Sequence, residues 1–368
     1  MSKVPLIDIP RSQRQCEFEI LSKWKEIFQS GRYILGNNLT SFENLFANYC
    51  QRKYAIGTNS GTDALLLSLM SLGVGKGDEV IVPAFTFFAT AAVVERVGAK
   101  TVFADVEEET YMIDVDDLTR KITAKTKAII PVHLFGQSAN IQKLIEISSL
   151  DKLLIIEDAS QAAGAEYRGR KIGSFGDISC FSFYPTKNLS ACGDSGIVLT
   201  DNSENDSWIR KARNHGMIGK THDYNFLGIN SRMDELQAAA LATKLSYLDE
   251  WNNQRKNIAK RYLAELEGIH FLRLQIVYDG SDPTWNKFCI RVLCNRENLR
   301  KHLASEGVDT EIYYPNALTK TAYFSKQNYD CPVAERLQAE ILAIPCFPGM
   351  NSSEQDRVIS AIKSYKGD

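Results

Sequence analysis

The chain has 368 residues, of which 44% are hydrophobic and 24% charged, and its formal net charge at pH 7 is −2. This size and composition suit one large globular domain with a smaller one, and the charge gives no reason to expect nucleic acid or an anionic membrane as a partner. No apolar run approaches the roughly 20 residues that span a bilayer, and the first residues lack a secretory signal, so we expect a cytoplasmic protein.

Helical and strand patterns alternate through the first two-thirds of the chain. Apolar residues on a helical period predict helices over 62–75, 89–98 and 141–150. Short apolar runs predict strands over 78–85, 101–106, 127–136, 152–160, 178–185 and 195–201. Strands that alternate with helices need crossover connections, which predicts an α/β fold with a mainly parallel sheet between helices.

The pattern changes after residue 230. Residues 231–268 predict long helical structure, broken or bent near Trp251–Asn253. Shorter strands over 286–293 and 310–315 and helices over 296–307, 333–344 and 352–365 follow. We therefore expect a large domain over residues 1–250 and a smaller C-terminal α/β domain over 251–368.

Eight cysteines and five histidines are scattered along the chain. The cysteines form no C-x-x-C pair, and the histidines show neither H-x-x-x-H nor H-E-x-x-H spacing. In a cytoplasmic chain this pattern indicates reduced thiols rather than disulfides. It also gives no support for a metal site.

Three segments place chemically useful residues where strands are predicted to end, which is where open α/β sheets bind ligands. In "GTNSGTDALLLSL", from Gly57, small polar residues lead into a helix whose first turn could bind phosphate, with Gly61 and Thr62 at its start. Taken alone, an ordinary Ser/Thr helix cap explains this segment as well.

The other two segments carry an acid and an amine. Asp158 ends the apolar run "KLLIIED", where a partly desolvated carboxylate needs a cation such as a protonated pyridine nitrogen. A helix cap or a structural salt bridge would also explain it. Lys187 follows a predicted buried strand, where desolvation would favour Schiff-base chemistry, although a surface loop lysine is the simpler alternative.

Together, a phosphate cradle, a strand-end carboxylate and a strand-end lysine are what pyridoxal 5′-phosphate (PLP) requires. The phosphate would fix one end of the ring, the carboxylate would keep the ring nitrogen protonated, and the lysine would hold the aldehyde carbon. Phe87, at another strand end, could stack on the ring, or could simply pack in the core.

The sequence resembles the DegT/DnrJ/EryC1/StrS family of PLP-dependent sugar aminotransferases, which have the type I, aspartate aminotransferase-like fold. The resemblance covers nearly the whole chain. It is carried by the order and spacing of "GRYILG", "NSGTDAL", "GDEVIVPAFTFFATA", "TKAIIPVHLFGQ", "IEDASQAAGA", "SFYPTKNL", "GDSG" and "GINSRMDELQAA".

The resemblance implies a role for individual residues. Lys187 would form the Schiff base with the cofactor and move the proton, and Asp158 would pair with the pyridinium nitrogen. The other implied cofactor contacts are Gln161 near the ring oxygen, Gly61, Thr62 and Ser182 at the phosphate, and Phe87 on the ring. Asn230 would reach the phosphate in a partner subunit, Arg232 would join the same shared site, and Tyr313 and Tyr314 would border the sugar. The active sites of a homodimer would then be shared.

Two positions depart from the family pattern. Ala163 stands where many members have histidine, which puts the substrate contacts in doubt but not PLP binding. Ser195 replaces a glycine, so that the usual Gly-Asp-Gly-Gly becomes Gly-Asp-Ser-Gly. That string is similar to the nucleophile loop of serine proteases. A protease, however, would need a histidine, an aspartate and a β-barrel pattern, so we expect Lys187 and not Ser195 to react.

The implied reaction is transamination of a nucleotide-linked keto-sugar with L-glutamate as amino donor. "SGRYILG" resembles members that act on 3-oxo sugars, so we expect a UDP- or dTDP-linked 3-oxo-hexose or 3-oxo-hexuronate, and a product used in surface polysaccharide or lipopolysaccharide. The alternatives are a C4 aminotransferase acting on a 4-keto-6-deoxy sugar and a non-catalytic, PLP-binding regulatory protein. Relatives that dehydrate keto-sugars replace the lysine with histidine, so Lys187 argues against that reaction.

Overall fold

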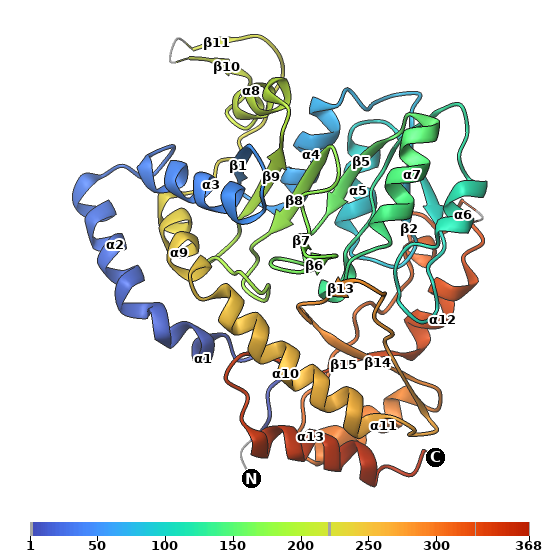
Figure 1. Cartoon of the computed structure of the whole chain (residues 1–368). Helices are drawn as coiled ribbons and strands as arrows, with labels where there is room; N and C mark the ends of the chain where they lie inside the picture. Colours follow the sequence, from blue (N-terminus) through green and yellow to red (C-terminus); the bar gives the residue numbers. More distant parts are fainter. Residues whose placement is uncertain (1–2, 220–221, 328, 368) are drawn as a thin grey trace.

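A seven-stranded sheet forms the centre of the larger part of the molecule (Figure 1). The computed structural model describes residues 3–219, 222–327 and 329–367. The strands of this sheet are β1 (Tyr54–Thr58), β2 (Glu79–Pro83), β3 (Lys100–Ala104), β4 (Thr126–Ile129), β5 (Leu154–Asp158), β8 (Ile178–Ser182) and β9 (Gly196–Thr200). Their order across the sheet is β1-β9-β8-β5-β4-β2-β3.

Most neighbouring strands of this sheet run in the same direction. β2 pairs in parallel with β3 and β4, β4 with β5, and β5 with β8. Only β9 runs the other way, and it pairs antiparallel with both β8 and β1. The strands are almost entirely buried, as expected for a parallel sheet covered by helices. The prediction of a mainly parallel sheet is confirmed.

Helices connect these strands and pack against them. α4 (Gly61–Ser71) contacts β8 and β9, α5 (Ala89–Arg96) contacts β2 and β3, α7 (Ile141–Asp151) contacts β5, and α8 (Ser203–Ala212) contacts β1 and β9. The remaining helices of this part are α1 (Ile9–Gln13), α2 (Glu17–Ser30), α3 (Asn37–Tyr49), α6 (Val115–Arg120) and α9 (Glu235–Leu245). α9 packs against both α2 and α3.

A second apolar core lies in the C-terminal part of the chain. It contains a three-stranded antiparallel sheet of order β12-β14-β15, made of β12 (Leu272–Leu274), β14 (Phe288–Val292) and β15 (Ile341–Ile344). Helices α10 (Leu248–Leu266), α11 (Arg296–Ser305), α12 (Pro332–Glu340) and α13 (Ser352–Ser364) accompany it. Leu248 belongs to the first core and Ile258 to the second, so α10 joins the two. The division at residue 250 stays a prediction.

Short elements complete the chain. β10 and β11 form a hairpin that extends beyond α8 (Figure 1), and β13, β6 and β7 form a small separate sheet. Their bounds are β6 (Glu166–Tyr167), β7 (Arg170–Lys171), β10 (Met217–Ile218), β11 (Asp223–Tyr224), β13 (Ser281–Asp282), η1 (Arg14–Cys16), η2 (Leu134–Gly136) and η3 (Leu318–Lys320). Of the helices described, none combines the length and the apolar character needed to cross a membrane. All eight cysteines are free thiols.

Three local predictions were wrong. The long helical segment breaks between Leu245 and Leu248 rather than near Trp251–Asn253. Asn252 instead lies within α10, where its buried side chain donates to the carbonyl of Ala163 (3.0 Å). Residues 341–344, predicted to continue a helix, pair with β14 as a strand. Residues 310–315 form only an isolated bridge at Glu311. In each case tertiary contacts override the local pattern.

A buried carboxylate fixes the end of β5, one residue before Asp158. Glu157 is fully buried and accepts hydrogen bonds from His133, Ser179 and the amides of Gly173, Phe175 and Gly176. The Nδ1 atom of His133 accepts from the amide of Ala139 (3.1 Å), so its Nε2 atom carries the hydrogen donated to Glu157 (3.1 Å). Burial raises the pKa of Glu157, but the hydrogen bonds outweigh it and lower the pKa to about 2.

We expect the substitution Glu157→Gln to lower the free energy of unfolding by about 3 kcal/mol, because it removes the charge that these donors surround. The folded-state pKa lies below the ordinary value, so the stabilisation is complete above pH 4.5 and is lost as the pH falls towards 2. Urea unfolding at a series of pH values measures both effects. The exposed Glu306→Gln variant is the control, and equal losses in the two variants would contradict the assignment.

Candidate active site

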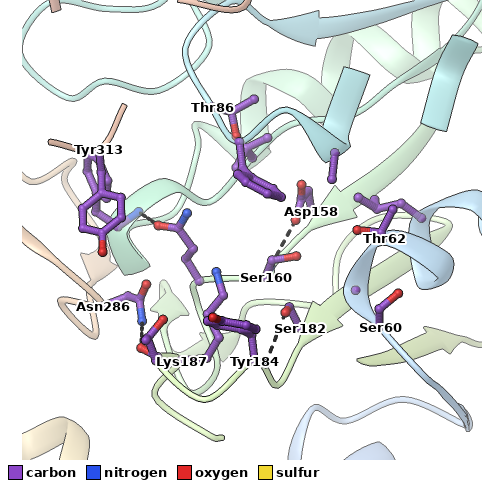
Figure 2. A pocket seen from close by; sticks show the side chains of 18 of the residues that line it. Ser60, Thr62, Thr86, Asp158, Ser160, Ser182, Tyr184, Lys187, Asn286 and Tyr313 are labelled. Carbon is purple, nitrogen blue, oxygen red and sulfur yellow. Dashed lines mark hydrogen bonds between the residues drawn. The ribbon is translucent and has the colours of Figure 1, made fainter. Parts of the chain in front are cut away.

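A cavity of about 600 Å³ opens at the ends of the central strands (Figure 2). It is bordered by the segments that follow β1, β2, β5 and β8, together with residues that precede β14. Because parallel strands end at the same edge of a sheet, residues distant in the chain meet here. The cavity is lined by nine of the predicted site residues: Gly61, Thr62, Phe87, Asp158, Gln161, Ser182, Lys187, Tyr313 and Tyr314.

One end of the cavity is formed by the first turn of α4. Ser60 caps this helix, and its hydroxyl accepts from the amide of Asp63 (3.1 Å). A methyl group on Gly61 would lie 2.7 Å from Cβ of Ser182, so only glycine lets the helix start so close to the end of β8. A methyl group on Gly196 would likewise lie 2.3 Å from the carbonyl of Ser60. The free amides of a helix N-terminus beside the Ser182 and Thr62 hydroxyls suit a phosphate.

Asp158 lies at another wall of the cavity, at the end of β5. It is 4% exposed, and its two oxygens accept from the hydroxyl of Thr90 (2.8 Å) and the amide of Ser160 (3.2 Å). Neither donor carries a charge, so a cationic donor in the cavity would complete the surroundings of a carboxylate. A protonated ring nitrogen is such a donor.

Gln161 links two walls of the cavity. Its carbonyl oxygen accepts from the amide of Phe135 (2.9 Å), and its amide nitrogen donates to the phenol of Tyr314 (2.9 Å). Tyr314 in turn packs near Phe87, with ring centroids 6.0 Å apart. The side chain of Phe87 is 56% exposed, so it is not the core residue that the simpler alternative required. Its ring is available to a ligand.

Lys187 reaches into the cavity from a turn that follows β8. Its amide donates to the carbonyl of Tyr184 (2.9 Å), which closes a turn with Pro185 at its second position. Burial lowers the pKa of Lys187 to about 8, and the negative charge of Asp158 opposes part of that shift. The amine is therefore partly neutral near physiological pH, as a nucleophile or a base must be.

Asn230 and Arg232 lie outside the part of the cavity that this chain forms by itself. Asn230 is exposed and its carbonyl accepts from the side chain of Asn59 (3.4 Å), while Arg232 donates to the side chain of Asn214 (2.7 Å). The Nε atom of Arg232 has no hydrogen-bond partner in the described part of the chain. The roles assigned to both residues in a partner's site stay predictions.

The two departures from the family pattern have different surroundings. Ser195 lies at the cavity wall, but its hydroxyl donates to the carbonyl of Asp194 (2.6 Å) and contacts no histidine in the part of the chain that is described. Ala163 is buried beside Asn252, away from the lining of the cavity. Residues 3–219, 222–327 and 329–367 contain no cluster of three His, Cys, Asp or Glu side chains placed to hold a metal ion.

Several residues of the site were not predicted from the sequence. Thr90 holds Asp158 from within α5, and Asn286 and Lys287 enter the cavity just before β14. Lys287 carried a signal, because a lysine inside the apolar run "TWNKFCIRVL" is unusual. Thr90 carried none, since a threonine in the first turn of a helix is common.

The residues present fit PLP. An anion cradle, a carboxylate without a charged hydrogen-bond donor and a lysine with a lowered pKa line one cavity of suitable volume. Ser182, Gly61 and Thr62 would hold the phosphate, Asp158 the ring nitrogen, and Phe87 the ring face. Lys187 would attach the cofactor covalently.

Comparison with known proteins agrees with this geometry. The sequence profile of the DegT/DnrJ/EryC1/StrS aminotransferase family matches residues 15–363. A dTDP-3-amino-3,4,6-trideoxy-alpha-D-glucose transaminase of Streptomyces venezuelae is 38% identical over 99% of this chain and 96% of its own length. A UDP-N-acetyl-3-dehydro-alpha-D-glucosamine 3-aminotransferase of Acidithiobacillus ferrooxidans is 38% identical over 98% of this chain and 97% of its own.

A solved structure shows the same fold. The crystal structure of DesV from S. venezuelae, in complex with a ketimine intermediate, superposes with a TM-score of 0.96. It is 38% identical, and the superposition covers 99% of this chain and 98% of that one. The predicted type I aminotransferase fold is therefore confirmed.

We expect the substitution Asp158→Asn to lower the pKa of Lys187 below about 8 in the cofactor-free protein, because it removes the charge that favours the protonated amine. Competitive labelling of amines at a series of pH values, resolved by mass spectrometry, measures this pKa. Thr90→Val, which keeps the charge of Asp158 and removes only its hydroxyl donor, should change the pKa much less. An unchanged or higher pKa in Asp158→Asn would contradict the coupling.

Proposed function

The chain belongs to the DegT/DnrJ/EryC1/StrS aminotransferase family of PLP-dependent enzymes, and we propose that it transfers the amino group of L-glutamate to C3 of a nucleotide-linked 3-oxo sugar. The acceptor would be a UDP- or dTDP-linked 3-oxo-hexose or 3-oxo-hexuronate. The observation that carries the proposal is the Lys187 amine, which lies in one cavity with Asp158 and the phosphate cradle of α4.

The residues of the cavity have distinct tasks in this reaction. PLP, when bound, supplies an electron-withdrawing ring that takes up the electrons left when the amino donor loses its α-proton. The Nζ atom of Lys187 takes that proton and returns it, which its pKa of about 8 permits near neutral pH. Asp158 holds the positive charge of the ring nitrogen in place. The Gln161–Tyr314 pair keeps the facing wall rigid.

The choice of C3 rests on two observations. Both relatives described above are named for amination at C3 of a sugar, one linked to dTDP and the other to UDP. The segment "SGRYILG" also resembles members that act on 3-oxo sugars. The complete set of Lys187, Asp158 and Gln161 in one cavity supports catalysis over a purely regulatory role. An amino sugar of this type would serve surface polysaccharide or lipopolysaccharide synthesis, and its nucleotide-linked precursor would be met in the cytoplasm.

A homodimer with shared active sites would explain residues that one chain leaves unused. Asn230 and Arg232 do not line the cavity of their own chain, although the resemblance assigns both to an active site. Helix α2, at the side of the molecule in Figure 1, exposes large apolar residues, among them Phe18 (86% exposed) and Phe28 (61% exposed). Exposed apolar side chains of this size are typical of a surface that a partner covers.

We expect the purified holoenzyme to lose its cofactor absorption band with L-glutamate and to recover it with an NDP-3-oxo sugar but not with an NDP-4-oxo sugar. Stopped-flow absorbance with a panel of both sugar types, and analysis of the amino sugar formed, test this. Recovery with 4-oxo sugars alone would establish the C4 alternative. Lys187→Ala should block both changes, by a factor of about 10³ or more; a Lys187→Ala variant that still cycles would refute the mechanism.

We expect two inactive variants, Lys187→Ala and Asn230→Ala, to restore activity when their subunits are mixed. If each site takes Lys187 from one chain and Asn230 from the other, a mixed dimer has one intact site of two. Because half of randomly mixed dimers are of the mixed type, about a quarter of the wild-type activity should return. Steady-state assays after co-refolding measure it. The control is a mixture of Lys187→Ala with Asp158→Asn. One chain supplies both Lys187 and Asp158 to a site, and every chain of this mixture lacks one of the two. The mixture should therefore stay inactive whether or not the sites are shared between subunits.

A further inference from the structure

Lys287 is a second lysine in the cavity, and the reaction just described gives it no task. It precedes β14, is only 8% exposed, and lines the same cavity as Lys187. Within the described part of the chain, its amine has no hydrogen-bond partner. A buried ammonium group without a partner is costly, which points to a missing ligand.

The protein supplies only a weak interaction to this amine. The Lys287 amine lies 5.0 Å from the centre of the Tyr313 ring, a cation–π contact that offsets little of the loss of hydration. Burial, together with the positive charges of Arg255 and Lys187, lowers the pKa of Lys287 to about 7. Arg255 is itself buried, and it donates to a carbonyl oxygen, that of Cys346, rather than to a carboxylate.

This region is separate from the phosphate cradle. In Figure 2, Asn286 and Tyr313, the neighbours of Lys287 in sequence and in space, lie on the other side of Lys187 from Ser60 and Thr62. The cavity therefore has two positions that favour an anion. The second is close enough to Lys187 for their charges to interact, so it suits a small anionic group carried by a substrate that reacts at Lys187.

We propose that Lys287 binds a carboxylate group of a substrate during the reaction. The inference rests on the proposed function, since both proposed substrates can bring a carboxylate here. L-Glutamate carries one on the carbon that bears the amino group, and a 3-oxo-hexuronate carries one at C6. The chemistry is the same in both cases, a single carboxylate held by an ammonium group.

The first test measures binding without turnover. Isothermal titration calorimetry with glutarate, a dicarboxylate that has no amino group, is carried out on the holoenzyme and its variants. We expect Lys287→Met to weaken glutarate binding about tenfold or more, and Lys287→Arg, which keeps the charge, to weaken it much less. Lys301→Met, which removes an exposed lysine of α11, is the control and should bind as the wild type does.

The second test identifies which substrate brings the carboxylate. Single-turnover absorbance is followed with L-glutamate, with an NDP-3-oxo-hexose and with the matching hexuronate. A weakened response to L-glutamate assigns the site to the amino donor, and a weakened response to the hexuronate but not to the hexose assigns it to the acceptor. Cofactor absorbance and the thermal unfolding midpoint confirm that each variant is folded, and Lys287→Gln replaces Lys287→Met if the latter does not load the cofactor.

Two results would overturn the proposal. One is that the Lys287→Met variant binds glutarate, L-glutamate and the hexuronate as tightly as the Lys301→Met control does. The other is a loss of affinity for the carboxylate-free hexose as large as the loss for the carboxylates, which would indicate a structural role. Glutarate binding requires no reaction. If no sugar reacts, that result counts against the proposed function, and the glutarate titration still decides whether Lys287 binds a carboxylate.

Discussion

The chemistry of the cavity depends on the balance between the Lys187 amine and the Asp158 carboxylate. Burial favours the neutral amine, and the carboxylate favours the charged one, so their sum leaves Lys187 with a pKa of about 8. Sheet pairing fixes this balance. β5 and β8 are parallel neighbours, with Asp158 paired to Cys180, and Lys187 follows from the turn seven residues later. The strand register therefore positions the acid relative to the amine, while Glu157 and its donors hold the end of β5.

The single reversed strand of the sheet, β9, also contributes to the edge where the cavity lies. β8 ends at the cavity, and β9, which runs the other way, begins there. As a result Gly196 packs against the backbone of Ser60 and Gly61, and Ser182 packs against Gly61. The N-terminus of α4 can approach both strands only because Gly61 and Gly196 have no side chain. The reversal of β9 thus helps to form the phosphate end of the cavity.

The sequence predicted those features that depend on strands and their ends. It missed those that depend on how segments distant in the chain pack against one another. Asp158 and Lys187 could be placed together because parallel strands end at one edge, whatever the details of packing. The break at Ser246–Tyr247 could not be predicted, since Asn252 looks like a helix breaker until its contact with Ala163 is known. Lys287 reaches the cavity only because the second sheet packs beside the first, and no local pattern fixes that arrangement.

The distribution of charge in the cavity suits an enzyme that must bind two substrates in turn. A permanent ion pair at Lys287 would have to break each time a substrate enters, and its strength would be subtracted from the affinity for that substrate. Lys287 has a pKa of about 7, and among the described residues its amine contacts only the ring of Tyr313, so it has no such pair to break. It can lose its proton when the cavity holds no anion and regain it when a carboxylate arrives. The same property that makes Lys287 costly to bury makes it suitable for binding that must be repeatedly reversed.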